Sequence, residues 1–349
     1  NITPEIRERM ESFSLRTDIV WACHDLAWFM RAFSFLGNAW VWGGVGEGHT
    51  DYIPAFLAKP FVAVAEVAGR PPILSYESYS PQNWCRFDPE KLIELGNIGV
   101  IQNFFGGCDE NGFILGHVEI DARGAPIPVC ALGLVKAAVN DNPADATHCF
   151  GGIIRSLDGM NATLKRMPEL CDPYIYFKRV RPFIHGWKSN PALPDGVRYE
   201  GCFKGESQWF YRGETGAQNA LFPTLYALLG VRFTDDVYLQ YLHEMRKYMP
   251  PRHRGFIMFL EEAEQSGFSV VSLAKKYKAE RRVLFDQVQE TLALMIEFLK
   301  THIGYASSYI QKQAQKDAAN PTAVGTGGTP FMKYLAEHID RLEEMQNSL

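Results

Sequence analysis

The side chains best suited to chemistry in this chain are its nine histidines, which stand at positions 24, 49, 117, 148, 185, 243, 253, 302 and 338. The stretch HEMRK at 243–247 places Lys247 where a zinc protease carries its second histidine. No other group of His, Cys, Asp and Glu has the spacing of metal ligands, and no Gly-x-Ser-x-Gly stretch is present. Hydrolysis by a protein-bound zinc or by a serine triad is therefore not expected.

One histidine, His302, lies in a regular apolar pattern. The pattern advances in steps of three and four residues, which places its members on one face of a helix. The members are Val288, Leu292, Met295, Leu299, His302, Ala306 and Tyr309. A histidine in such a buried stripe is either a neutral core imidazole that donates to a backbone carbonyl or an axial ligand of haem iron. The pattern alone leaves both interpretations open.

Two further polar residues stand among aromatic ones. Arg181 has Phe177, Phe183 and Trp187 as neighbours in the sequence. Its guanidinium either reaches solvent or forms a fork for a carboxylate beside an aromatic slot. His117 follows Phe113 by one helical turn and is open to a purely structural role as well.

The stretch GTGGTP at 325–330 is glycine-rich and precedes a helix, as phosphate-binding loops do. Its glycines do not follow the order Gly-x-Gly-x-x-Gly, because Pro330 occupies the sixth position. The chain contains no Gly-Lys pair, which a P-loop requires. The loop is therefore not predicted to bind phosphate, and by itself it resembles a surface connection.

The elements that position these residues are predicted to be helices. Residues 53–69 have helical apolar spacing closed by Gly69, with Pro60 expected to kink or divide the helix. Residues 233–249 form a second helix that ends before two prolines, and residues 269–313 form a long tract broken near 280. Strict alternation of apolar and polar residues is scarce. We therefore predict an all-α protein with long loops.

Composition narrows the class of protein further. The chain has 349 residues, of which 46% are hydrophobic and 13% aromatic, and its net charge is −5. Such a balance does not predict nucleic-acid binding. The seven cysteines form no Cys-x-x-Cys pair, which favours a reducing, cytoplasmic location. No apolar run or leader predicts a membrane span or secretion. The first residue is Asn1 rather than Met, so we expect that residues preceding it are missing.

Four stretches together resemble the indoleamine 2,3-dioxygenase family. They are GWKSNPALPDGVRYEG (186–201), GETGAQNALFP (213–223), RKYMPPRHRGFIMFLEE (246–262) and GTGGTPFM (325–332). The resemblance extends from about residue 60 to about residue 335. It implies an all-α fold in which a small N-terminal domain, 1–104, caps a large helical domain, 112–349, with residues 105–111 as the linker and haem b between the two domains.

The resemblance also implies a reaction. Members of this family insert both atoms of O₂ across the indole C2–C3 bond of L-tryptophan or a related indoleamine, giving N-formylkynurenine. A reductant is needed only to keep the haem iron ferrous. Two alternatives remain open: a haem monooxygenase acting on a substituted tryptophan, and a haem-binding gas sensor without turnover.

Site residues follow from the resemblance position by position. It implies that His302 is the proximal iron ligand, that Arg181 holds the substrate carboxylate, and that Thr326 closes over the substrate amine. The remaining residues that it places around haem and substrate are Tyr76, Phe113, Tyr176, Phe177, Thr215 and Gly216. We expect the loop 313–328 to be a lid that is mobile without substrate and ordered with it.

Two departures from the family are visible. At position 117 animal enzymes of the family carry Ser, whereas this chain has His, as tryptophan 2,3-dioxygenases do. We therefore expect His117 to act at the catalytic site, accepting a hydrogen bond from the indole N–H. The stretch GAPIP at 124–128 also interrupts a segment that would otherwise be one helix.

Overall fold

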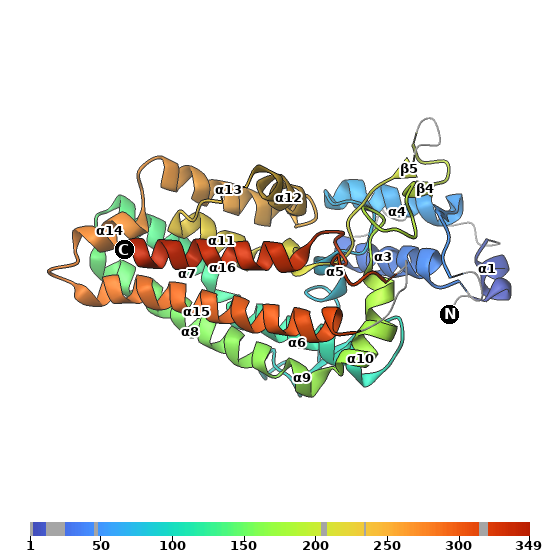
Figure 1. Ribbon diagram of the computed structural model, residues 1–349, viewed down its shortest axis with the longest axis horizontal. Helices are drawn as coiled ribbons and strands as arrows, with labels where there is room; N and C mark the ends of the chain where they lie inside the picture. Colours follow the sequence, from blue (N-terminus) through green and yellow to red (C-terminus); the bar gives the residue numbers. More distant parts are fainter. Residues whose placement is uncertain (1–2, 12–24, 45–47, 204–207, 234, 314–319) are drawn as a thin grey trace.

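The computed structural model describes residues 3–11, 25–44, 48–203, 208–233, 235–313 and 320–349. Helices dominate this part of the chain, which confirms the predicted all-α class. Figure 1 shows an elongated molecule with its two ends built from different parts of the sequence. The long helices α6, α7, α8, α15 and α16 run along one end, and α1, α3, α4 and the strands β4 and β5 lie at the other.

The elements follow the chain in a simple order. The helices are α1 (Pro4–Glu11), α3 (Leu26–Trp42), α4 (Ala55–Ala68), α5 (Tyr76–Tyr79), α6 (Cys108–Gly124), α7 (Pro126–Val139), α8 (Pro143–Lys165), α9 (Met167–Leu170), α10 (Pro173–Ile175), α11 (Leu221–Leu229), α12 (Asp236–Arg246), α13 (Pro251–Gln265), α14 (Val270–Lys276), α15 (Arg282–Ala306) and α16 (Phe331–Ser348). Short π and 3₁₀ turns are η1 (Tyr176–Val180), η2 (Arg181–Ile184), η3 (Gly216–Gln218) and η4 (Ser307–Gln311). The strands are β1 (Tyr52–Ile53), β2 (Trp84–Arg86), β3 (Ile98–Val100), β4 (Val197–Tyr199) and β5 (Gln208–Trp209).

Local signals account for most of the helix ends. Helix α4 ends at Gly69, whose φ of 64° is the left-handed conformation that glycine adopts without steric cost. Pro60 lies inside α4 without dividing it, so the expected division there is wrong. The tract 269–313 is broken between α14 and α15, as predicted near residue 280. Helix α12 begins at Asp236 because the side chain of Asp235 caps it by accepting a hydrogen bond from the Tyr238 amide.

The strands are too short to form a layer of their own. Strand β4 pairs with β1 in parallel and with β5 in antiparallel fashion, and β2 and β3 form a separate antiparallel pair. The β1–β4 pairing brings residues near 52 beside residues near 198. These strands therefore tie the early part of the chain to the segment after Arg181.

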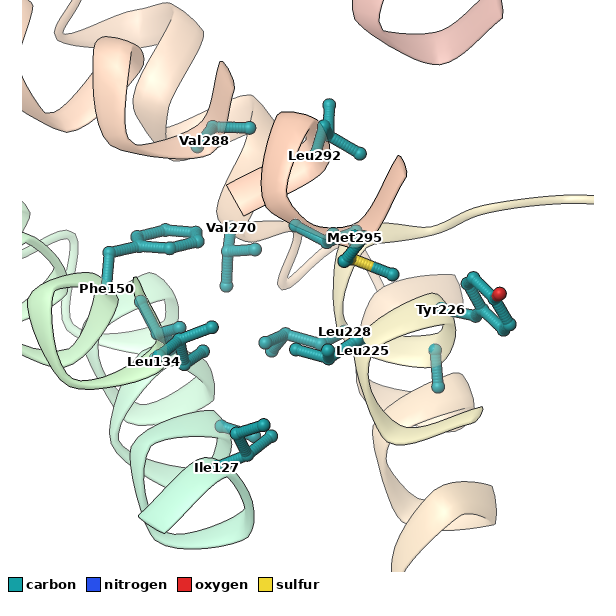
Figure 2. Packing of buried hydrophobic residues seen from close by; sticks show 14 of the residues in the cluster. Ile127, Leu134, Phe150, Leu225, Tyr226, Leu228, Val270, Val288, Leu292 and Met295 are labelled. Atoms are coloured by element: carbon teal, nitrogen blue, oxygen red, sulfur yellow. The ribbon is translucent and has the colours of Figure 1, made fainter. Parts of the chain in front are cut away.

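The main core lies among the long helices. Buried side chains of α7 and α8 meet those of α11, α14 and α15, and Figure 2 shows part of this packing. The side chains labelled there are Ile127, Leu134, Phe150, Leu225, Tyr226, Leu228, Val270, Val288, Leu292 and Met295. The stripe predicted on α15 is confirmed, because its apolar members are all buried. His302 is the one member of the stripe that is only partly buried.

The GAPIP stretch separates two helices, as its sequence indicates. Helix α6 ends at Gly124, and α7 begins at Pro126. By length and composition alone, the segment Cys108–Val139 is apolar enough to cross a membrane, and 33% of its most apolar window is buried. Both helices pack against α8. Helix α6 begins at Cys108, so residues 108–111, assigned above to a linker, are helical.

The cysteines of the described residues form no disulfide bond. All six of them are free, and Cys23 lies outside the described residues. No group of three or more His, Cys, Asp and Glu in the described part of the chain is arranged to hold a metal ion.

Close packing of α6 generates a test of this architecture. A Cβ atom on Gly112 would lie 2.0 Å from the backbone oxygen of Leu170, so α6 approaches the end of α9 as only glycine permits. Gly112→Ala should lower the free energy of unfolding by about 1–3 kcal/mol or more, since backbone must move. Thermal and urea unfolding measure this.

Gly255→Ala is the matched control for that substitution. Gly255 lies within the exposed face of α13, where an added Cβ would meet nothing within 4 Å. Alanine there should raise stability by up to about 1 kcal/mol through helix propensity. Equal effects of the two substitutions would contradict the close approach of α6 to α9.

Candidate active site

One face of α6 carries the first group of site residues. Phe113, His117 and Asp121 follow one another at intervals of four and keep partial exposure inside the helical end of the molecule. The ring of Phe113 lies 4.5 Å from that of His117. Tyr76 approaches from α5, with 5.9 Å between the centroids of its ring and that of His117, and its hydroxyl donates to Asp121 over 2.9 Å. These four side chains form a continuous wall.

His117 is held in one tautomer by its own helix. Its Nδ1 lies 2.7 Å from the carbonyl oxygen of Phe113, and a carbonyl can only accept, so Nδ1 carries the proton. Burial lowers the pKa of His117 below its ordinary value, partly opposed by that hydrogen bond. The ring is therefore neutral at pH 7, and Nε2 is left as an acceptor.

His302 lies on α15 near this wall. Burial, and secondarily the proximity of His117, lower the pKa of His302 to about 4. Its imidazole is therefore neutral at pH 7, and it forms no hydrogen bond with any residue that the structure describes. It is both desolvated and partly accessible. A neutral, unpartnered imidazole of this kind fits an iron ligand better than a core residue that donates to a carbonyl.

A π turn supplies the next residues. Residues Tyr176–Val180 form η1, and one-turn π segments of this kind recur at functional sites. Tyr176 turns its ring toward Phe113, with 4.8 Å between the ring centroids. Phe177 is fully buried, and the guanidinium of Arg181 lies over its ring at 5.6 Å. The turn thus continues the aromatic wall and ends at a cation.

Arg181 is fully buried and is held by the loop that precedes α16. One terminal nitrogen donates to the side-chain oxygen of Asn320, and the other donates to the carbonyl of Val324 over 2.7 Å. Asn320 also donates to the Phe177 carbonyl over 2.7 Å. Burial lowers the pKa of Arg181 to about 10, so the group stays charged at pH 7. Its Nε atom has no partner.

Thr215, Gly216 and Thr326 lie where three segments meet. The hydroxyl of Thr326 donates to the carbonyl of Glu214, and its own carbonyl accepts from the Gly186 amide over 3.1 Å. Gly327 packs on Thr215, with an added Cβ lying 3.2 Å from the methyl group of that threonine. The residues 320–330 are thus docked on the segments before and after residue 200. The lid predicted for 313–328 stays a prediction, and residues 314–319 of this segment lie outside the described residues.

The structure therefore brings all the predicted site residues into one region. Ring contacts join Tyr76 to His117, His117 to Phe113, and Phe113 to Tyr176. His117 is also close enough to His302 to contribute to its lowered pKa. A bridge joins Tyr76 to the segment that carries Thr215: the side chain of Gln218 accepts from the Tyr76 amide over 2.9 Å and donates to Gly213 over 2.8 Å.

Three polar residues of this region were not predicted from the sequence. They are Asp121, Glu214 and Asn320. Burial raises the pKa of Asp121 to about 7 in spite of its hydrogen bonds to Asn219 and Tyr76. The four-residue spacing of Phe113, His117 and Asp121 was a usable signal for Asp121. No local pattern marks Glu214 or Asn320, because the residues that they meet in the fold are distant in the sequence. The backbone of Glu214 meets Ile184 and Thr326, and the side chain of Asn320 meets Arg181.

Comparison with known proteins gives a consistent result. The family model for indoleamine 2,3-dioxygenase matches residues 24–345. The chain is 29% identical to indoleamine 2,3-dioxygenase 1 of Mus musculus, over 90% of this chain and 78% of that protein. It is 30% identical to the indoleamine 2,3-dioxygenase acdA of Aspergillus candidus, over 88% and 77%. It is also 26% identical to the 6-hydroxytryptophan 2,3-dioxygenase fscD of Fusarium equiseti, over 93% and 83%.

Docking of the loop can be measured at one amide. The Gly186 amide donates to Thr326, so its hydrogen exchange reports whether the loop is docked. Thr326→Ala removes the hydroxyl that binds Glu214 and should speed that exchange about fivefold, the effect of losing one net hydrogen bond.

Thr322→Ala serves as the matched control. Thr322 belongs to the same loop and forms no hydrogen bond with any described residue. Saturating tryptophan should slow Gly186 exchange in the wild type if the loop closes over substrate. Exchange at Gly186 that neither variant nor ligand alters would show that the loop is only a surface connection.

Proposed function

Because this chain belongs to the indoleamine 2,3-dioxygenase family, we propose that it cleaves the indole C2–C3 bond of L-tryptophan with O₂ to give N-formylkynurenine. The enzymes of this family are haem-dependent oxidoreductases, and haem b is accordingly the cofactor. The preferred indole and the product are our proposal. We also propose a cytoplasmic enzyme that acts on a small molecule, with no nucleic-acid or membrane partner.

The observation that carries this proposal is the pair of neutral histidines on α6 and α15. His302 offers an unpartnered imidazole, and His117 offers a free Nε2 acceptor from the opposite helix. A purely structural pair would be expected to use its polar atoms on neighbouring backbone or side chains. The imidazole of His302 is therefore suited to coordinate haem iron, and Nε2 of His117 is suited to accept a hydrogen bond from an N–H group of the substrate.

Haem b fits the residues present. His302 would hold the iron, and Thr215 would lie beside the group on the side of η3. When bound, haem supplies the activation of O₂, with a reductant needed only to keep the iron ferrous. We place it between the N-terminal domain 1–104 and the helical domain 112–349. Of the predicted connection 105–111, residues 108–111 already belong to the first turn of α6.

The chain's own residues bind and orient the substrate. The indole packs against Phe113, Tyr176 and Phe177, which exclude water from the reacting bond. His117 Nε2 accepts a hydrogen bond from the indole N–H and fixes the direction of the ring. Arg181 binds the substrate carboxylate, which requires its fork to exchange the oxygens of the docked loop for those of the ligand.

Thr326 and Gly216 border the place where the substrate backbone lies in this proposal. Docking of the loop through Thr326 closes the site around the ligand. A substituted tryptophan is a second candidate substrate, because one relative is named as a 6-hydroxytryptophan 2,3-dioxygenase. A monooxygenase would transfer one oxygen atom, and a gas sensor would not need the buried Arg181.

Labelled oxygen tests the function directly. The holoenzyme is reduced without oxygen, mixed with L-tryptophan and ¹⁸O₂, and the product is identified by its mass. We expect N-formylkynurenine that carries two labels. His302→Ala should lose haem and product, whereas His148→Ala, on the exposed surface of α8, should keep both. A singly labelled hydroxyindole product, or no product from reduced wild-type enzyme, would contradict the proposal.

The free acceptor on His117 generates a second test. 1-Methyltryptophan lacks the indole N–H and should be a poor substrate of the wild type. His117→Ser should reduce kcat/KM for tryptophan by about 2- to 10-fold, since a buried neutral hydrogen bond contributes about 0.5–1.5 kcal/mol. It should reduce kcat/KM much less for 1-methyltryptophan. An unchanged ratio between the two substrates would show that His117 does not bind the indole nitrogen.

A further inference from the structure

Glu214 is a buried carboxyl group with nothing to bind. Its side chain is 4% exposed, and it accepts no hydrogen bond and pairs with no cation among the described residues. Two other glutamates are equally buried but fully partnered. Glu110 accepts from the Phe104 and Phe105 amides, and Glu119 pairs with Arg123 over 2.8 Å. A buried carboxyl group without a partner is costly, so its retention calls for a ligand.

The backbone of Glu214 is held in place on both sides. The Glu214 amide donates to the Ile184 carbonyl over 3.1 Å, and its carbonyl accepts from the Thr326 hydroxyl. The preceding residue, Gly213, is pressed so tightly on Gly186 that an added Cβ would lie 2.2 Å from the Gly186 nitrogen. The Cα atom of Glu214 is therefore anchored between the segment of Arg181 and the loop that carries Thr326.

The Glu214 carboxyl group lies near the aromatic wall of the site. Burial is the main cause that raises the pKa of the hydroxyls of Tyr76, Tyr79 and Tyr176, and a negative charge on Glu214 adds a smaller contribution to each. Tyr76 and Tyr176 are the same rings that contact His117 and Phe113. The carboxyl group is thus close to the rings that border the proposed substrate site.

Glu214 and Arg181 are not paired with each other. The guanidinium fork is bound to Asn320 and Val324, and Glu214 pairs with no cation among the described residues. A buried cation and a buried carboxyl group that served only the fold would gain most by forming one ion pair. Left unpaired with each other, they offer one group for each charge of a zwitterion.

We propose that Glu214 binds the ammonium group of the substrate, so that this site selects indoles that carry a cationic amine. An ammonium supplies three donors and one positive charge, which is what an unpartnered carboxylate lacks. Arg181 would bind the carboxylate of the same molecule. The inference rests on the proposed function, since it takes the ligand to be an α-amino acid with an indole side chain.

Proton release gives a signature that a structural role would not produce. Burial raises the pKa of Glu214 to about 8, so the ligand-free group is mostly protonated at pH 7 and must lose its proton to bind a cation. The other titratable groups of the site are Tyr76, Tyr79, His117, Asp121, Tyr176, Arg181 and His302, whose pKa is lowered to about 4. Of these, only Asp121, with its pKa raised to about 7, also titrates near neutral pH, and it is unchanged in a Glu214 variant.

The test is calorimetric binding of three probes to the ferric holoenzyme at pH 7. L-Tryptophan carries both charges, tryptamine only the ammonium, and indole-3-propionate only the carboxylate. Glu214→Gln should weaken tryptophan and tryptamine by about tenfold or more, because a charge-assisted buried pair is lost. It should leave indole-3-propionate unchanged or tighter. Glu214→Asp should recover part of the loss, and Glu290→Gln, on the exposed face of α15, should change nothing.

Protons are counted in the same experiment by repeating it in buffers of different ionisation enthalpy. Wild type should release close to one more proton with tryptophan than Glu214→Gln does. Equal weakening of all three probes would reduce Glu214 to a packing role and overturn the inference. Unchanged affinities with an altered haem spectrum would make Glu214 a partner of the cofactor and overturn it as well.

The same measurement separates this inference from the proposed function. Wild-type protein that binds tryptophan, with Glu214→Gln binding it equally well, would sink the inference and leave the function standing. Wild-type protein that binds none of the three probes would sink the proposed function itself. Misfolding is checked by the melting temperature: Glu214→Gln removes an unpaired buried acid, so we expect no decrease.

Discussion

The buried guanidinium of Arg181 is the constraint on which the rest of the site depends. A charge with no exposed surface must find acceptors inside the protein, and here two of them come from residues 320–324. That need brings a distant loop over the aromatic wall and places Thr326 against Glu214. A π turn immediately before Arg181 aims it over Phe177. The loop 320–326, the aromatic wall and Arg181 are thus connected by direct contacts, so a change in one of them should alter the position of the others.

Burial also determines the charges of the site. Desolvation keeps His117 and His302 neutral, which their proposed roles as acceptor and iron ligand require. The same desolvation leaves Arg181 charged, since a fall in its pKa to about 10 is still far above neutrality. It raises the pKa of Glu214 to about 8, so that the proposed cationic ligand would change its protonation state. One physical effect therefore yields two neutral imidazoles, a permanent cation and a carboxyl group that titrates near neutral pH.

The sequence predicted what depends on local pattern. The break between α14 and α15, the end of α4 at Gly69 and the buried stripe that contains His302 all follow from residue spacing and end signals. The resemblance added Arg181 and Thr326, which spacing alone left open. Glu214 and Asn320 were not predictable, because their roles arise from segments about 30 to 140 residues apart that meet only in the fold. Position 117 was recognised only because its residue type departs from the family.

The glycines of the loop 325–328 allow close packing of the backbone, whereas the sequence suggested that they provide flexibility. Gly328 has a φ of 72°, and a Cβ there would lie 2.2 Å from the Lys188 carbonyl oxygen. Gly213 and Gly186 also lie so close to each other that neither has room for a Cβ atom. Glycine at these positions permits backbone to lie on backbone, which closes the layer above Arg181 and Glu214. The stretch thus resembles a phosphate loop for a physical reason: both need glycine where backbone must approach closely, here another part of the same chain instead of a phosphate.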